Sequence, residues 1–274
     1  MARRDFLICV DSDGCVMDTM NIKHKKCFGP CIIEEWGLES RREKILKRWN
    51  EINLFSMTRG VNRFRGLAMM LEEINRDYET IEGLDEFRRW VDKTDELSNA
   101  ALKKAVDEGG GICLEKALSW SEWVNRYADM LSDNEKKPFC GAREALETAH
   151  NCADTAIVSS ANRSAVDSEW SKNGLIACVD LVFSQEDGSK SAALEKLLGK
   201  GYLPERVLMV GDAPGDLTAA EENGVLFYPI LAENEEGSWK RFKDEACAKF
   251  ICGAYSGQYQ RKLIDEFKYN LACS

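Results

Sequence analysis

Short apolar runs of strand length alternate with amphipathic segments along the second half of the chain. The apolar runs lie at residues 155–158, 179–183, 207–210 and 225–228. Segments with the 3.6-residue helical spacing lie before or between them, at residues 142–151, 163–173, 189–198 and 216–223. One further apolar run, residues 6–10, stands near the N-terminus. Alternating strands and helices form a parallel sheet with right-handed crossovers, so the pattern predicts an α/β, Rossmann-like core.

The stretch from about residue 21 to residue 137 has a helical pattern instead. Its apolar residues follow the helical period in four expected helices, at residues 40–52, 61–75, 84–109 and 114–132. Five of the seven tryptophans lie here. Aromatic residues at helical spacing pack a core more often than they bind a cofactor.

The sequence therefore predicts one α/β core interrupted by an inserted, all-helical domain. The expected core comprises residues 1–19 and 138–274, and the inserted domain comprises residues 20–137. The C-terminal stretch, residues 237–274, is expected to form two further helices, to which the pattern assigns no role.

The composition is that of a folded globular protein, with 44% hydrophobic and 31% charged residues in a chain of 274. A formal net charge of -10 argues against binding to a nucleic-acid backbone, and no apolar stretch is long enough to span a bilayer. The few residues before the first expected strand leave no room for a signal peptide. We therefore expect a cytoplasmic protein whose eleven scattered cysteines are reduced, with neither nucleic acid nor membrane as a partner.

Two carboxylates follow directly after the first expected strand. Asp11 and Asp13 are two residues apart, and Gly14 comes next. Along an extended chain, side chains two residues apart point to the same side, so both carboxylates can face one small space. Two like charges this close repel, unless one holds a proton or both share a cation. The arrangement suits a nucleophile beside a general acid around a divalent metal, and the simpler alternative is a turn with two solvated acids.

Polar residues also follow the later expected strands. Ser159 and Ser160 come directly after the second strand, where hydroxyls and backbone N–H groups at a helix start form an anion site. Lys190 lies at the start of the helix after the third strand, and Asp212 and Asp216 follow the fourth. Each residue taken singly could be no more than a helix cap or a solvated first-turn residue. Their shared position at the carboxyl ends of strands favours one joint site.

The motifs Asp-x-Asp-Gly, a strand-terminal Ser, a Lys and Gly-Asp-x-x-x-Asp, in this order, resemble those of the haloacid dehalogenase (HAD) superfamily. This superfamily comprises phosphatases and related phosphoryl-transfer enzymes. The resemblance covers residues 6–18 and about 138–228, and the helical insertion corresponds to the cap that the family carries between its first and second motifs. The insertion is longer than the smallest helical caps of the family.

The resemblance implies a role for each residue of the first and last motifs. Asp11 would be the nucleophile that forms an aspartyl-phosphate, and Asp13 would be the general acid and then the general base. Mg²⁺ would be bound by the side chains of Asp11 and Asp212 and by the backbone carbonyl of Asp13. Asp216 would bind the metal or its waters.

Phosphate contacts are implied for Ser159 and Lys190, and Ser160 offers a further hydroxyl beside them. In the helical insertion, Arg59 and Arg63 lie near an expected helix start, and arginine suits the bidentate recognition of anions. We expect these two arginines to contact the substrate, and a solvated basic helix end is the alternative.

The resemblance implies a Mg²⁺-dependent phosphatase whose partner is a small phosphorylated metabolite. Asp13 favours phosphoryl transfer over carbon–halogen cleavage, because an alkoxide leaving group needs a proton and a halide does not. A phosphomutase of the same superfamily is the nearest alternative. A binding or regulatory protein that keeps the fold without turnover is the other.

Overall fold

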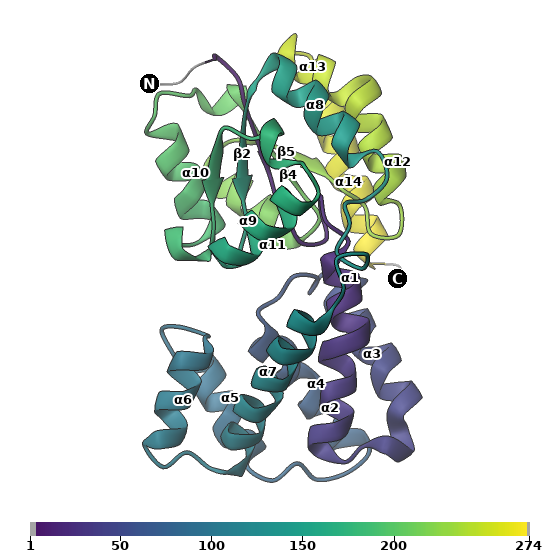
Figure 1. The fold of residues 1–274 in the computed structure, drawn as a ribbon, viewed down its shortest axis with the longest axis vertical. Helices are drawn as coiled ribbons and strands as arrows, with labels where there is room; N and C mark the ends of the chain where they lie inside the picture. Colours follow the sequence, from purple (N-terminus) through teal and green to yellow (C-terminus); the bar gives the residue numbers. More distant parts are fainter. Residues whose placement is uncertain (1–3, 273–274) are drawn as a thin grey trace. The chain divides into compact units, whose positions relative to one another are not determined.

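The computed structural model describes residues 4–272 of the chain. The predicted core domain also includes residues 1–3 and 273–274, which lie outside these described residues. The chain forms two compact units, one comprising Met1–Met20 with Ser132–Ser274 and the other comprising Asn21–Leu131. Figure 1 colours the chain by position, and the purple N-terminal strand runs in the same unit as the green strands of the second half.

A five-stranded sheet forms the centre of the first unit, and all its strands are parallel in the order β3-β2-β1-β4-β5. The strands are β1 (Leu7–Val10), β2 (Asp154–Val158), β3 (Leu181–Phe183), β4 (Val207–Gly211) and β5 (Leu226–Pro229). The predicted α/β core with a parallel sheet is confirmed, and each strand begins and ends within two residues of its predicted range. β1, β2 and β4 are buried along their whole length, which accounts for their continuous apolar runs in the sequence.

The register of the three central strands decides where the polar residues after them lie. Val10, the last residue of β1, pairs with Ile157 of β2 and with Val210 of β4. The backbone N–H of Asp11 continues this pairing and donates to the Val210 carbonyl at 3.0 Å. The carboxyl ends of the three strands therefore meet at one edge of the sheet, where open α/β folds bind their ligands.

The helices of this unit follow the strands in the predicted alternation. They are α8 (Ala142–Cys152), α9 (Arg163–Lys172), α10 (Lys190–Leu198), α11 (Pro214–Glu222), α12 (Glu235–Arg241), α13 (Cys247–Ile251) and α14 (Gln258–Ala272). A π-helical turn, Phe242–Ala246, joins α12 to α13, and 3-10 turns form at Ile176–Cys178, Gln185–Asp187 and Pro204–Arg206. In Figure 1, α8 gathers with the C-terminal helices on the right of the unit, and α12 and α13 pack against α8 while α14 packs against β5.

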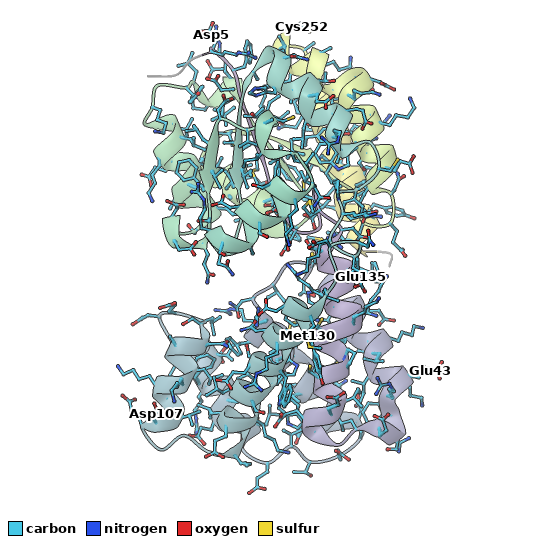
Figure 2. All side chains as sticks on the ribbon, in the orientation of Figure 1. Asp5, Glu43, Asp107, Met130, Glu135 and Cys252 are labelled. Carbon is cyan, nitrogen blue, oxygen red and sulfur yellow. The ribbon has the colours of Figure 1, made fainter. Side chains whose placement is uncertain are left out.

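The regular structure of the second unit is helical. After α1 (Thr19–Lys23) and a π-helical turn (His24–Phe28), the chain forms α2 (Gly29–Trp36), a 3-10 turn (Glu39–Arg41), α3 (Arg42–Leu54), α4 (Arg63–Asp77), α5 (Leu84–Lys93), α6 (Asn99–Asp107) and α7 (Ile112–Met130). The second unit has an apolar core of its own, in which Trp49 and Trp120 are fully buried. Charged side chains such as Glu43 and Asp107 lie on the outside (Figure 2). Within residues 4–272, no helix combines the length and the hydrophobicity that crossing a membrane requires.

The predicted helix over residues 84–109 is wrong, because two helices form there. The chain is extended at Thr94, where α5 has ended, and the Ser98 hydroxyl accepts from the N–H of Ala101 at 3.2 Å. This cap starts α6 and competes with a continuous helix. No glycine or proline marks the break, which is why the sequence pattern alone does not reveal it.

The two units divide at residue 131 rather than at the predicted residue 137. Residues 132–137 belong with the core because their backbone bonds to it. The Lys137 carbonyl accepts from the N–H of Asp18 at 2.9 Å, and the Lys136 carbonyl accepts from the Asn173 side chain at 2.9 Å. Such a segment has no apolar period, so only its contacts assign it to a unit.

Replacing Trp120 with alanine should destabilise the helical unit strongly. The change empties a 0% exposed position and removes the hydrogen bond from the indole to the Phe28 carbonyl, so the free energy of unfolding should fall by about 3–5 kcal/mol. Trp123 lies on the same helix and is 44% exposed, so Trp123→Ala should cost less than about 1 kcal/mol. Urea unfolding followed by circular dichroism measures both, and equal losses would contradict the assigned core.

Candidate active site

Asp11 is held at the carboxyl edge of the sheet by its own loop and by α10. The residue is 5% exposed, and its Oδ1 accepts from the N–H of Ser12 at 2.7 Å. Lys190, the first residue of α10, brings its Nζ to 2.8 Å from Asp11 Oδ2. The carboxylate and the lysine that the sequence singled out are therefore in direct contact.

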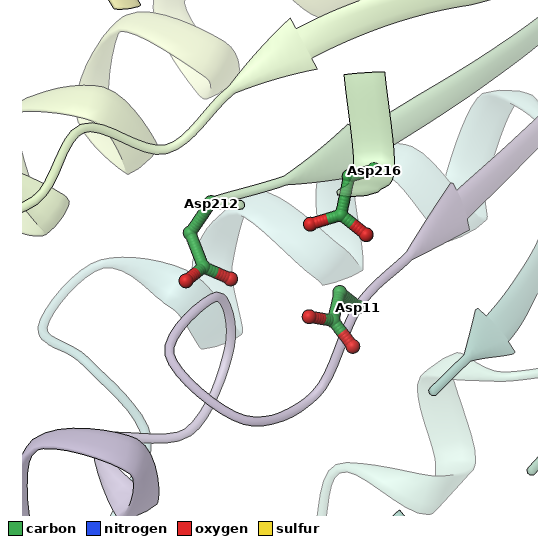
Figure 3. Close-up of side chains that lie close together, drawn as sticks. All are labelled: Asp11, Asp212 and Asp216. Carbon is green, nitrogen blue, oxygen red and sulfur yellow. The ribbon is translucent and has the colours of Figure 1, made fainter. Parts of the chain in front are cut away.

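Asp212, just after β4, and Asp216, in the first turn of α11, approach Asp11 (Figure 3). Both are 0% exposed, and one carboxylate oxygen from each of the three residues lies within 4.8 Å of the others. Lys190 Nζ also lies 2.5 Å from Asp216 Oδ1, so it bridges two of the three carboxylates. Among residues 4–272, this is the group of side chains that could hold a metal ion.

The turn after β4 brings Asp216 this close because Gly211 has no side chain. The second carboxylate oxygen of Asp216 accepts from the N–H of Ala213 at 3.0 Å, at the start of α11. A Cβ atom at Gly211 would overlap with the Asp216 carboxyl group. The glycine of the Gly-Asp-x-x-x-Asp motif is therefore a packing requirement of the carboxylate cluster.

Burial and neighbouring charges have opposite effects on the pKa values of Asp11 and Lys190. Burial raises the pKa of Asp11 well above its usual range, Lys190 opposes this shift, and the charges of Asp216 and Asp212 add to it. Burial alone would lower the pKa of Lys190, but Asp11 and Asp216 raise it above its usual value, so Lys190 stays protonated. Three buried carboxylates lie within a few ångströms of one another, and burying like charges together is costly.

The donor atoms fit a divalent metal ion that prefers oxygen ligands. Asp11, Asp212 and Asp216 all present carboxylate oxygens. Mg²⁺ and Ca²⁺ bind such oxygen sets, whereas zinc sites commonly include sulfur or imidazole ligands. A shared divalent cation would reduce the mutual repulsion of these carboxylates.

Asp13 lies two residues beyond Asp11 on the same loop and is only partly buried. Its Oδ1 accepts from the hydroxyl of Thr19, the first residue of α1. A carboxyl group that is oriented by a hydrogen bond and still open to solvent can exchange protons with a substrate and with water. The sequence motifs did not point to Thr19, because it lies outside the Asp-x-Asp-Gly motif, at a helix start where threonine is a common residue.

Ser159 and Ser160 follow β2, the strand next to β1. Ser159 is 4% exposed, its N–H donates to the Phe183 carbonyl at 3.0 Å, and its hydroxyl accepts from the N–H of Ala161 at 3.1 Å. Ser160 is exposed. Both serines lie at the edge of the sheet that carries Asp11, and their contact with a phosphate stays a prediction.

Arg59 and Arg63 belong to the helical unit, and substrate contact stays a prediction for both. Arg59 is 2% exposed and donates to the Leu54 carbonyl at 2.6 Å, so the alternative of a solvated side chain is wrong for Arg59. Arg63 donates to the Ser121 hydroxyl at 3.1 Å and to Asn125 Oδ1 at 2.7 Å. Burial lowers the pKa of Arg63 to about 10, which leaves its guanidinium protonated at neutral pH.

Two buried tryptophans hold the loop that follows β1. The indole N–H of Trp170, on α9, donates to the Ser12 hydroxyl at 2.9 Å, and that of Trp239, on α12, donates to the Cys15 carbonyl at 3.0 Å. Both tryptophans are 0% exposed. They lie 158 and 224 residues from these partners along the chain, so no local motif reveals them. One role of α12 is therefore to position this loop.

One family model matches the part of the chain that contributes Ser159, Lys190, Asp212 and Asp216 to this edge of the sheet. The model for haloacid dehalogenase-like hydrolases matches residues 85–230, more than half of the chain. The chain belongs to this hydrolase family. The family match begins after β1, so the sheet register is what brings Asp11 beside the matched Lys190, Asp212 and Asp216. A search of curated proteins found no match.

Solved structures of other haloacid dehalogenase-like proteins share this fold. A hydrolase of the family from Streptococcus pneumoniae has a TM-score of 0.55 at 16% identity, covering 88% of this chain and 91% of its own. A candidate phosphoglycolate phosphatase from Lactobacillus delbrueckii subsp. bulgaricus has a TM-score of 0.56 at 12% identity, covering 94% and 100%. A predicted phosphoglycolate phosphatase from Haemophilus somnus has a TM-score of 0.51 at 14% identity, covering 84% and 87%. At these identities the similarity concerns the fold alone.

Replacing Gly211 with alanine should disturb the carboxylate cluster, whereas the same change at Gly215 should not. A Cβ atom at Gly211 would overlap with the Asp216 carboxyl group, and at Gly215 it would meet no atom within 4 Å. Overpacking typically costs about 1–3 kcal/mol, so Gly211→Ala should lower the free energy of unfolding by a similar amount. Gly215→Ala, in the first turn of α11, should be neutral or slightly stabilising. Urea unfolding measures both, and a neutral Gly211→Ala would contradict the close packing.

Replacing Trp239 with phenylalanine should slow the enzyme by releasing the loop after β1. The change keeps an aromatic ring and removes the hydrogen bond to the Cys15 carbonyl, so we expect kcat to fall by about 10-fold or more, with a smaller change in KM. Tyr255→Phe is the matched control, because it removes a hydrogen bond from a 0% exposed side chain to the Phe227 carbonyl on β5. Both variants should lose about 1–3 kcal/mol of stability.

Steady-state kinetics and thermal unfolding of the two variants test this role of Trp239. Equal stability losses with a lower kcat in Trp239→Phe alone would support it. An unchanged kcat in Trp239→Phe, or an equal fall in Tyr255→Phe, would show that the hydrogen bond contributes to stability only.

Proposed function

We propose that this hydrolase is a Mg²⁺-dependent phosphatase that acts on a small phosphorylated metabolite through an aspartyl-phosphate intermediate. The observation that carries the proposal is the contact of Lys190 with Asp11 and Asp216 inside the cluster of buried carboxylates. A transferring phosphoryl group is anionic and needs positive charge at the point of attack. A lysine and a metal-binding cluster beside one carboxylate meet this need.

The Asp11 carboxylate is the proposed nucleophile. One of its oxygens attacks phosphorus, the bond from phosphorus to the leaving oxygen breaks, and the phosphoryl group moves to Asp11. The ion pair with Lys190 favours the ionised form of a carboxyl group whose pKa burial otherwise raises. Lys190 therefore favours the ionised, reactive form of the nucleophile against the effect of burial.

Asp13 is the proposed proton donor and acceptor. It gives a proton to the leaving alkoxide oxygen and then takes one from the water that attacks the phosphoryl group on Asp11. This second step releases inorganic phosphate and restores the Asp11 carboxylate. The hydrogen bond from Thr19 would orient Asp13 for both transfers.

Asp11, Asp212 and Asp216 are the side chains that would hold Mg²⁺, together with the backbone carbonyl of Asp13. When bound, the ion would supply positive charge that polarises the phosphoryl oxygens and offsets the crowded carboxylates. The preference of Mg²⁺ for oxygen ligands matches the donor set.

The substrate is proposed to be a small phosphorylated metabolite, and the helical unit is proposed to be the cap over it. Ser159 and Ser160 are the proposed contacts to phosphoryl oxygens, and Arg59 and Arg63 are the proposed contacts to the rest of an anionic substrate. Two of the proteins with a similar fold are named as candidate or predicted phosphoglycolate phosphatases, which supports a substrate of this class.

A phosphomutase is the nearest alternative, because it uses the same aspartyl-phosphate and returns the phosphoryl group to a sugar. A dehalogenase would need no proton for its leaving halide, so the hydrogen-bonded Asp13 favours phosphoryl transfer. A binding protein without turnover would need neither a proton donor nor a lysine held against a buried nucleophile.

Replacing Asp11 with asparagine should abolish phosphate release. The full-length protein is assayed with an aryl phosphate, with Mg²⁺ or with a chelator, and the wild type should release phosphate only with the metal. Asp11→Asn should lower kcat by at least about 10³-fold, because an amide is a poor nucleophile. Asp5→Asn makes the same chemical change on a 79% exposed side chain just before β1 and should keep full activity.

The same protein samples separate the candidate functions. Metal-dependent phosphate release that is lost in Asp11→Asn supports a phosphatase. Isomerisation of a sugar phosphate without net phosphate release would show a phosphomutase, and halide release from a 2-haloacid would show a dehalogenase. No phosphate release from the wild type, with aryl phosphate or with a panel of phosphorylated metabolites, would contradict the proposal.

A further inference from the structure

Two thiols of the first unit lie side by side outside the candidate active site. Cys152 is the last residue of α8, and Cys247 is the first residue of α13. Their Sγ atoms are 3.5 Å apart, although the residues are 95 positions apart in the chain. Because α8 leads into the amino end of β2, the pair lies away from the carboxyl edge that carries Asp11.

The two thiols differ in exposure and in charge environment. Cys152 is partly exposed, whereas Cys247 is 2% exposed. A hydrogen bond from Cys247 lowers the pKa of Cys152 to about 7, burial opposes this shift, and the Arg4 guanidinium adds to it. Arg4 is held at the end of α8 by bonds to the carbonyls of His150 and Ala153, at 2.6 and 3.2 Å. The Cys152 thiol also donates to the carbonyls of Thr148 and Ala149, each at 3.3 Å. Cys152 is the thiol of the pair whose pKa is lowered, and the thiolate is the reactive form of cysteine.

We propose that Cys152 and Cys247 form a reversible disulfide when the protein meets a low-molecular-weight disulfide such as glutathione disulfide. The sulfur atoms would have to move from 3.5 Å to the bonded distance of about 2.0 Å, which is a small displacement for two adjacent side chains. The proposal rests on the thiol pair and not on the proposed phosphatase activity.

The reaction proceeds in two balanced exchange steps. The Cys152 thiolate attacks one sulfur of glutathione disulfide, forms a mixed disulfide and releases one glutathione thiolate. Cys247 then loses its proton and attacks the Cys152 sulfur, which releases the second glutathione. The protein loses two protons and two electrons, and glutathione disulfide gains them to become two molecules of glutathione.

Other thiols of the same unit are less suited to this reaction. Cys140 is exposed but donates to the Glu236 carboxylate, which raises the pKa of Cys140. Cys252 is exposed at the surface, after α13 (Figure 2), and its thiol contacts the Lys249 carbonyl at 3.5 Å rather than a second thiol. Cys9 is 0% exposed, and burial raises its pKa. The Cys152–Cys247 pair combines a neighbouring thiol, partial exposure and a lowered pKa.

A disulfide at this position would join α8 to the C-terminal helices. The loop that it closes contains β2 to β5 and also Trp239, which contacts the loop after β1. A cross-link across a long loop reduces the conformational freedom of the unfolded chain. The oxidised protein should therefore have a higher Tm than the reduced protein, by at least about 5 °C.

The experiment uses the full-length chain with Cys140, Cys252 and Cys273 replaced by serine, so that these thiols form no mixed disulfides. The reduced protein is incubated with glutathione disulfide, and intact mass, peptide mapping and Tm are measured. We expect the loss of two hydrogen atoms, one cross-linked peptide pair containing Cys152 and Cys247, and a raised Tm. A reductant should reverse all three changes.

Two single variants in the same background test the order of the steps. With Cys247→Ala, no second thiol is available, so Cys152 should retain one glutathione as a stable mixed disulfide. With Cys152→Ala, the buried Cys247 should remain unmodified. Circular dichroism of each variant confirms that it is folded.

Several results would overturn the proposal, and each is visible without an enzyme assay. These are an unchanged mass of the parent protein, a cross-link that includes a different cysteine, or the same loss of hydrogen in Cys152→Ala. A glutathione adduct that persists on the parent protein would also overturn it, because Cys247 would then fail to attack the mixed disulfide.

Discussion

The mutual repulsion of buried carboxylates is the constraint on which this structure depends. Asp11, Asp212 and Asp216 come from two separate segments of the chain, and Lys190 comes from a third. Lys190 contacts two of the three carboxylates and supplies one positive charge against their combined negative charge. Such an arrangement is costly in a low dielectric, so the packing of the core has to enforce it. The proposed phosphoryl transfer would use this cluster, because carboxylates that lie close together attract a divalent cation.

Both the sheet and the helices around it position the residues of the candidate site. The register of β1 with β4 brings Asp11 beside the turn that carries Asp212, and the missing side chain of Gly211 lets Asp216 close in. Two indole groups, from α9 and α12, hold the loop after β1 by its Ser12 hydroxyl and its Cys15 carbonyl. The C-terminal helices are therefore part of the support of the site, although the family match ends at residue 230.

The helical unit owes its stability to a separate core. Trp49, Phe64 and Trp120 pack against other aromatic rings there, and the Trp120 indole bonds to the Phe28 carbonyl. None of these side chains belongs to the apolar core of the first unit, so each unit has its own hydrophobic driving force. A chain with two such cores can vary one of them while the candidate site on the other is kept.

The sequence by itself determined the alternation of strands and helices, the insertion between the first and second strands, and the carboxylates and lysine of the site. These features are local, because a buried strand is a continuous apolar run and its polar end follows within a few residues. The sequence did not reveal the break inside the predicted helix over residues 84–109, because a serine cap starts the second helix there and no glycine or proline marks the break. Only the tertiary structure decided that Thr19 orients Asp13, that Trp170 and Trp239 hold the loop, and that Cys152 meets Cys247. The last three contacts join residues about 100 to 220 positions apart, and hydrogen bonds over such separations leave no periodic or spaced pattern in the chain.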